Sequence, residues 1–301
     1  MAYSTLHLPA AKAAWPAGLE STLTYRGLVL NDLSQPDRYK IKSIQGLFDP
    51  EVRDSRENNP SRHGETAYES FYGGKQIVIQ GTIIAGNLSK LRNMISDLQA
   101  AFSDISSEYP LYFTTFGSQV YINCKKSASL EIGEEFNKRI PQHEFQITLK
   151  ASDPFVYGVT ENTASITPTF TSQRGRIYNG TYSRTYSSYT TALDSVIATN
   201  NGNFNNLPRF KITGSFGTAA IINSTTGQKI VLNAGPGDNF YFTYSLRDNT
   251  LVDVNNISRT DVLDYISDNL YLAPGANTIK FSVSSYSVNT KLDIYYRDTY
   301  L

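Results

Sequence analysis

The chain has 301 residues, which is enough for two domains of ordinary size, each with its own core. Its 27 basic and 27 acidic residues cancel, so it lacks the basic excess with which sequence-independent nucleic-acid binders displace counterions. The single cysteine, Cys124, excludes an intrachain disulfide, and no stretch approaches the ~20 apolar residues of a membrane-spanning helix.

The first residues of the chain show little hydrophobic pattern, and the residues after them alternate between apolar and polar side chains. We expect residues 1–20 to form an N-terminal arm. Residues 22–30 alternate between apolar and polar side chains well enough to predict one strand, and residues 39–44 predict a second.

A long polar segment, residues 49–69, interrupts this alternation and predicts a loop. It has no apolar periodicity. Loops longer than ~12–15 residues are uncommon in compact domains and are usually functional or disordered. The segment is therefore either a contact element for another molecule or a solvated excursion. If it makes contacts, the candidate residues are its charged side chains: Asp49, Glu51, Arg53, Asp54, Arg56, Glu57, Arg62, Glu65 and Glu69.

A strand and then a helix follow this polar segment. Residues 75–84 alternate as a strand, and Gly81 inside the run indicates a bulge or a close backbone approach. From residue 88 to residue 102, apolar side chains recur at three- and four-residue steps behind Asn87, a good N-cap residue. Strands are predicted again at 111–116, 119–124, 128–132 and 144–150. One helix among strands needs a sheet face to cover, so residues 1–157 are predicted to form an α+β domain.

The second half of the chain changes character twice. Residues 158–206 are rich in Ser, Thr, Asn, Gly and Tyr and predict a polar linker or an extended arm. Residues 207–301 then alternate strongly, with turn residues between the runs, and predict a β-sandwich. The alternating sets are Phe210 and Ile212; Phe240, Phe242 and Tyr244; Ile279, Phe281 and Val283; and Leu292, Ile294 and Tyr296.

The residue types needed for catalysis are scarce. Residues 207–301 contain no His, Cys, Trp or Met, which most nucleophile–base pairs and transition-metal sites require. His143-Glu144 lacks the second His of the zinc-protease motif, because Ile147 stands at that position. Cys124 lies in an alternating run and is expected to be packed. We therefore expect no enzyme activity, no catalytic residue, no cofactor and no metal.

Several stretches, in this order, resemble one protein family. They are YESFYGGKQIVIQGTIIAGNLSKLRNMISDLQAAF at 68–102, ITLKASDPFVYG at 147–158, and LPRFKITG, INSTTGQKIVL, LAPGANTIKF and DIYYRDTYL within 207–301. Together they resemble the distal tail protein of siphovirus-type bacteriophages, whose tails are long and non-contractile.

The resemblance implies a tail-tube-like β-barrel flanked by one helix in the first domain and a galectin-like β-sandwich in the second. It implies a hexameric ring in the virion tail, assembled in the host cytoplasm, that joins the tail tube to the tail tip or baseplate hub. The implied partners are copies of the chain, the tail-tube protein, the tip or hub protein, and receptor-binding proteins on the second domain. DNA would only pass through the lumen, without membrane insertion. In such subunits a long loop at 49–69 would reach the neighbouring subunit or ring.

The main alternative is a receptor- or carbohydrate-binding module of a phage tail. Galectin-type sugar sites use a Trp for stacking, and the only Trp is Trp15, far from the second domain in sequence. A likeness of fold does not carry a function across. Three tyrosines of the second domain could still stack on sugars: Tyr241, Tyr271 and Tyr286. We expect the second domain to be a scaffold.

Overall fold

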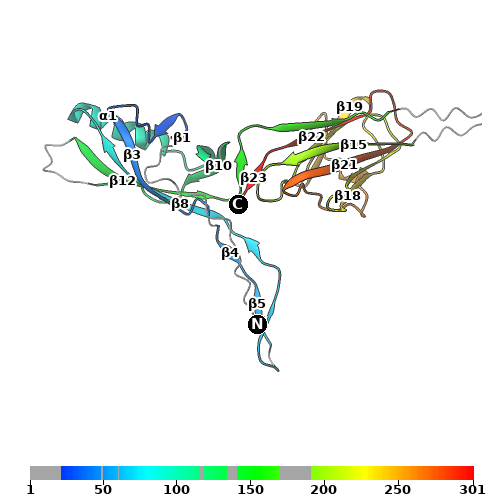
Figure 1. Ribbon diagram of the computed structural model, residues 1–301, viewed down its shortest axis with the longest axis horizontal. Helices are drawn as coiled ribbons and strands as arrows, with labels where there is room; N and C mark the ends of the chain where they lie inside the picture. Colours follow the sequence, from blue (N-terminus) through cyan, green and yellow to red (C-terminus); the bar gives the residue numbers. More distant parts are fainter. Residues whose placement is uncertain (1–21, 49, 60, 116–117, 134–140, 170–190) are drawn as a thin grey trace, which may run out of the picture. The chain divides into compact units, whose positions relative to one another are not determined.

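The computed structural model describes residues 22–48, 50–59, 61–115, 118–133, 141–169 and 191–301 (Figure 1). The chain divides into two compact units, Met1–Val156 with Leu301, and Tyr157–Tyr300. In the described part, strands dominate both units and the one α-helix is α1 (Leu88–Ala101). The predicted fold class, mainly β with one helix, is confirmed.

The first unit is an antiparallel sheet whose ends meet. The strand order is β2-β1-β9-β10-β12-β8-β3, with β11 paired to β12. The N–H of Asn31, just after β2, donates to the Tyr39 carbonyl in β3 (2.7 Å), so the two ends of this order lie together and close the sheet into a barrel. The strands are β1 (Leu23–Tyr25), β2 (Leu28–Leu30), β3 (Arg38–Gln45), β8 (Lys75–Ile84), β9 (Tyr109–Thr115), β10 (Ser118–Lys126), β11 (Glu131–Ile132) and β12 (Gln142–Ala151).

The centre of β8 shows why the barrel needs a glycine there. Ile77, Ile79 and Ile83 are buried, as the period of two predicts. The neighbouring strand β3 has a register shift between Ile41 and Ser43, opposite this part of β8. A Cβ on Gly81 would lie 2.5 Å from Cζ of Phe145 and 2.6 Å from the Lys40 carbonyl oxygen. The predicted bulge or close approach at Gly81 is therefore confirmed.

Helix α1 packs against the barrel by its apolar stripe. The Asn87 side chain accepts a hydrogen bond from the Lys90 N–H (2.9 Å) and caps the helix as predicted. Leu91 and Leu98 are buried. At the other end Phe102 stacks on Tyr25, with ring centroids 4.7 Å apart.

Two predicted strands of the first unit differ in the structure. Residues 22–30 form a hairpin rather than one strand, because Arg26 and Gly27 both have positive φ (46° and 83°), as a two-residue type I′ turn requires. The strand predicted at 128–132 is reduced to β11, the two residues Glu131 and Ile132.

The second unit is a β-sandwich of two antiparallel sheets around one buried cluster. One sheet has the order β14-β22-β16-β19-β20 and the other β15-β21-β17-β18. The strands are β14 (Asn162–Ile166), β15 (Thr191–Asn200), β16 (Arg209–Gly214), β17 (Thr218–Asn223), β18 (Lys229–Leu232), β19 (Gly237–Ser245), β20 (Thr250–Asp253), β21 (Gly275–Ser284) and β22 (Lys291–Tyr296). A 3-10 helix, η1 (Thr260–Val262), and the short strands β13 (Val156–Gly158) and β23 (Thr299–Tyr300) complete the elements.

The sandwich corrects the expectation that residues 158–206 form a linker. This stretch supplies β14 and β15, the edge strands of the two sheets. Asn200 and Asn206 in the same stretch are buried and bond to backbone carbonyls. The Tyr-rich part, 170–190, lies outside the described residues, as does the predicted N-terminal arm. In the predicted β19 set, Phe242 and Tyr244 are buried but Phe240 is exposed.

Candidate interaction surfaces

A narrow β-hairpin, residues 51–72, extends from the barrel sheet of the first unit (Figure 1). We call it the arm. It consists of β4 (Val52–Arg53) paired with β7 (Phe71–Tyr72) and of β5 (Arg56–Asn58) paired with β6 (Glu65–Ala67). Every described residue of the arm is exposed except Asn59, which is half-buried. The loop predicted at 49–69 is therefore a hairpin, and the backbone bonds between its strands account for its shape.

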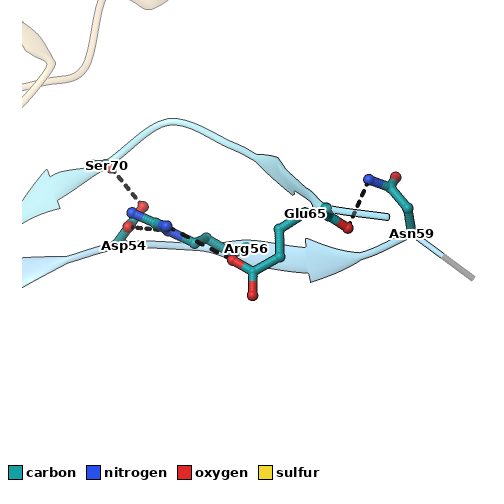
Figure 2. A network of polar contacts seen from close by, with 6 residues as sticks. Asp54, Arg56, Asn59, Glu65 and Ser70 are labelled. Carbon is teal, nitrogen blue, oxygen red and sulfur yellow. Dashed lines mark hydrogen bonds and ion pairs between the residues drawn. The ribbon is translucent and has the colours of Figure 1, made fainter. Parts of the chain in front are cut away.

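The centre of the arm holds a network of polar contacts (Figure 2). Nε of Arg56 lies 2.6 Å from Oδ2 of Asp54, and Nη1 lies 3.7 Å from Oε2 of Glu65. The Ser70 hydroxyl donates to Oδ1 of Asp54 (2.9 Å). The hydrogen bond from Arg56, followed by that from Ser70, lowers the pKa of Asp54 below its ordinary value. These contacts tie the two halves of the hairpin together across its width.

The distal part of the arm has contacts of its own. The Asn59 side chain donates to the Gly64 carbonyl (3.0 Å) and accepts from the Thr66 hydroxyl (2.9 Å), closing the turn. The Tyr68 hydroxyl donates to Oε2 of Glu57 (2.6 Å), and this bond raises the pKa of Tyr68.

The structure brings together only some of the charged residues that the sequence singled out. Asp54, Arg56 and Glu65 pair with one another, so these charges are engaged within the arm. Arg53 and Arg62 each make a long hydrogen bond within it, at 3.5 Å and 3.4 Å. Glu51 and Glu69 are exposed and make no ion pair with a described residue. Asp49 lies outside the described residues.

The arm also exposes apolar side chains, which were not among the contact residues predicted from the sequence. Val52 and Phe71 expose 58% and 59% of their surface, and Tyr68 and Tyr72 are also exposed. Val52 stands opposite Tyr72, and Arg53 opposite Phe71, so apolar groups occur on both faces of the β4–β7 ribbon. No periodic signal in the sequence identifies these four residues, because charged and polar residues surround them without a regular spacing.

The tyrosines considered for sugar stacking are poorly placed. Tyr286 is only 8% exposed, and its hydroxyl donates to the Thr169 carbonyl (3.2 Å). The Lys211 ammonium lies over the Tyr241 ring, 4.2 Å from its centroid, and so covers one ring face. Tyr271 is half-buried. No observation favours a sugar site at these residues.

Reactive groups are equally ill placed in the described part of the chain. Cys124 is fully buried in β10, and burial raises its pKa to about 12. No group of three His, Cys, Asp or Glu side chains that could hold a metal ion occurs among the described residues. Within the same residues, no helix is long and apolar enough to cross a membrane.

Comparison with known proteins gives a family match within the first unit. Residues 31–151 match the family model described as the phage tail protein RIFT-related domain. The resemblance seen in the sequence is thus confirmed for this domain, and its elements from β3 to β12 lie within the match. A search of curated proteins found no match to the chain.

Solved structures extend the comparison to the second unit. The Dit protein of phage SPP1, described as a paradigm of the hub adsorption apparatus of phages that infect Gram-positive bacteria, matches with a TM-score of 0.63. The match has 14% identity and covers 93% of this chain and 99% of that one. Two structures of the phage P2 baseplate, with Ca and with Sr, match at 12% identity with TM-scores of 0.45 and 0.41. They cover 91% and 89% of this chain and 97% and 98% of theirs. At 14% identity, this match shows that the chain shares the fold of the SPP1 protein.

Proposed function

We propose that this chain is a structural, non-enzymatic protein of a phage tail that forms a hexameric ring between the tail tube and the tail tip or baseplate hub. A phage tail domain in the first unit and the fold of a distal tail protein support this role. Its partners would be further copies of itself, the tail-tube protein and the tip or hub protein. The ring would be assembled in the host cytoplasm and kept in the virion.

The observation that carries the proposal is the exposure of the arm. An isolated two-stranded hairpin is at best marginally stable in water, because it has no hydrophobic face to bury. The arm is such a hairpin, and its described residues are exposed except Asn59, which is half-buried. Packing on a surface of another molecule would therefore stabilise it.

Both apolar and charged side chains of the arm would contribute to binding. Burying a large apolar side chain such as Phe71 or Val52 would contribute on the order of 1.5–3 kcal/mol. Exposed charges such as Glu51 and Glu69 would add specificity and orientation more than affinity. The Asp54–Arg56–Glu65 network would instead hold the arm in shape.

A contact of this kind favours a ring. The arm of one copy would bind a different surface of the next, which is a heterologous contact, and such contacts close into rings when the rotation allows. Six copies is the number that the resemblance to distal tail proteins implies.

The test is to remove the arm. Replacing residues 51–72 by a short Gly-Ser turn should leave both units folded, because the arm contributes almost no buried apolar area. Circular dichroism and the unfolding transition should match those of the wild type, while phage that carry the deletion should make no complete tails. A matched control shortens only the distal turn, 59–64, and keeps Val52, Phe71 and the polar network. Normal tails from the full deletion would contradict the proposal.

A further inference from the structure

One sheet edge of the second unit is covered by a segment that is not a strand. β18 is the last strand of the β15-β21-β17-β18 sheet (Figure 1). An edge strand presents a row of N–H and C=O groups that can pair with a strand of another molecule. On this side of β18 lie residues 264–268, which we call the strap. After one isolated bridge between Leu232 and Leu263, the chain of the strap turns at Tyr265 and Ile266.

The strap bonds to the backbone groups of β18 that point away from β17. The Val231 N–H donates to the Ser267 hydroxyl (3.0 Å), and the Val231 carbonyl accepts from the Asp264 N–H (2.9 Å). The Lys229 N–H donates to Oδ2 of Asp268 (3.0 Å), and the Lys229 carbonyl accepts from the Asp268 N–H (2.7 Å). In an antiparallel ladder the residues between these two bond to the other neighbour, here β17. Both outward N–H groups and both outward carbonyls of β18 are therefore paired.

The strap leaves few groups of its own for a further strand. Its side chains accept both N–H groups of β18, where a strand would use backbone carbonyls. Its own N–H groups are also engaged, since Ile266 donates to Oδ1 of Asp264 (3.1 Å) and Ser267 donates to the Asp264 carbonyl (3.1 Å). A regular strand in this place would expose an outer row of N–H groups and so only move the edge outward. The strap ends the sheet instead.

The middle of the strap is held by these polar contacts more than by burial. Val262 and Leu270, on either side of the strap, belong to the buried cluster of the sandwich. Between them, Tyr265 and Ile266 expose 96% and 41% of their surface. The strap is thus anchored at its ends, and Ser267 and Asp268 fasten its middle to β18.

We propose that the strap blocks β18 against edge-to-edge pairing with the β18 of another copy of this chain. The covered strand has the sequence Lys-Ile-Val-Leu, whose β-branched residues favour strand pairing. Without the strap, two such edges could pair antiparallel and join two sandwiches through one continuous sheet. The strap would act in the free chain, whether or not the proposed ring forms.

A simpler role for the strap is to connect η1 to Leu270 and to stabilise the sandwich. In that case, loss of its polar contacts would make the second unit easier to unfold but would create no specific contact through β18. The experiment must therefore separate edge pairing from aggregation that follows unfolding.

The experiment uses the purified full chain. The open variant carries Ser267→Ala and Asp268→Ala, which remove both side-chain acceptors of the strap. The matched control carries Ser245→Ala and Asp248→Ala, a pair that bonds to each other at the turn between β19 and β20. Sedimentation velocity measures the fraction of chain in particles heavier than those of the wild type. We expect this fraction to rise at least tenfold in the open variant and to stay at the wild-type value in the control. An unchanged fraction in the open variant would overturn the proposal.

A proline on β18 tests the mechanism. Val231→Pro removes an outward N–H, and the ladder to β17 does not use this group. Added to the open variant, it should lower the heavy fraction at least fivefold. Aggregation through unfolding would persist with the proline, and that result would overturn the proposal.

Hydrogen exchange gives a second measurement on the same particles. The amides of β18 should exchange faster in the dilute open variant than in the wild type and regain protection in the heavier particles. Heavier particles with unprotected β18 amides would contradict edge pairing. If circular dichroism shows that the double variant does not fold, Ser267→Ala alone, which removes the acceptor of the Val231 N–H, is measured in the same way and must show the same rise.

Discussion

At the scale of single residues, Gly81 lies at a position of the barrel where the neighbouring atoms leave no room for a side chain. A methyl group there would meet both the Phe145 ring and the Lys40 carbonyl. We expect Gly81→Ala to lower the free energy of unfolding by about 1–3 kcal/mol through overpacking. Denaturant unfolding measures the change. Gly133→Ala is the control, because the nearest atom to its new Cβ would be 3.8 Å away. Equal stability of the two variants would contradict this account of β8.

Asp54 gives a second prediction at this scale. Its pKa is lowered by hydrogen bonds from Arg56 and Ser70, so its contribution to the arm is present above its unfolded pKa and is lost as the pH falls through the lowered one. A carboxyl titration by NMR should find a midpoint below the ordinary value for Asp. Arg56→Gln should raise that midpoint, whereas Arg62→Gln, on the same arm, should not. An unchanged midpoint in Arg56→Gln would show that the contact is absent in solution.

At the scale of elements, substitutions in the arm can show whether its apolar side chains contribute to assembly. Arg56 is engaged within the arm, whereas Phe71 is exposed and available to a neighbouring surface. We expect Phe71→Ser to reduce the yield of complete tails at least tenfold. Leu88→Ser, at a side chain equally exposed in the first unit, should have little effect. The yield of complete tails is measured for phage carrying each variant. Equal yields would show that the apolar residues of the arm do not contribute to the contact.

Sequence patterns predicted those elements whose side chains divide into a buried and an exposed face. Helix α1 and strands such as β8 were found because their apolar residues recur with the period of the element. The arm was missed as a hairpin because both of its faces are exposed, so nothing in its sequence alternates by burial. β14 and β15 were missed because each is an edge strand of mixed composition beside a long polar stretch.

The contact role of the charged segment at 49–69 stays a prediction. Its charge density singled it out in the sequence, and the structure shows that residues 51–72 form an exposed hairpin. Charge density could not reveal that Arg56 pairs with Asp54 and Glu65, because that depends on the hairpin register. The exposure of Leu193 and Ile197 was equally hidden, since it depends on which sheet edge β15 occupies.

At the scale of the whole molecule, the first unit would build the proposed ring through its barrel and its arm. Deletion of the arm should therefore prevent ring formation and leave the sandwich folded.

A reconstruction of the assembled tail by electron cryo-microscopy tests the central claim most directly. The account predicts six copies of this chain in a closed ring between the last tube ring and the tip, with each arm seated on a neighbouring molecule. A single copy, a threefold arrangement, or six copies with free arms would contradict it.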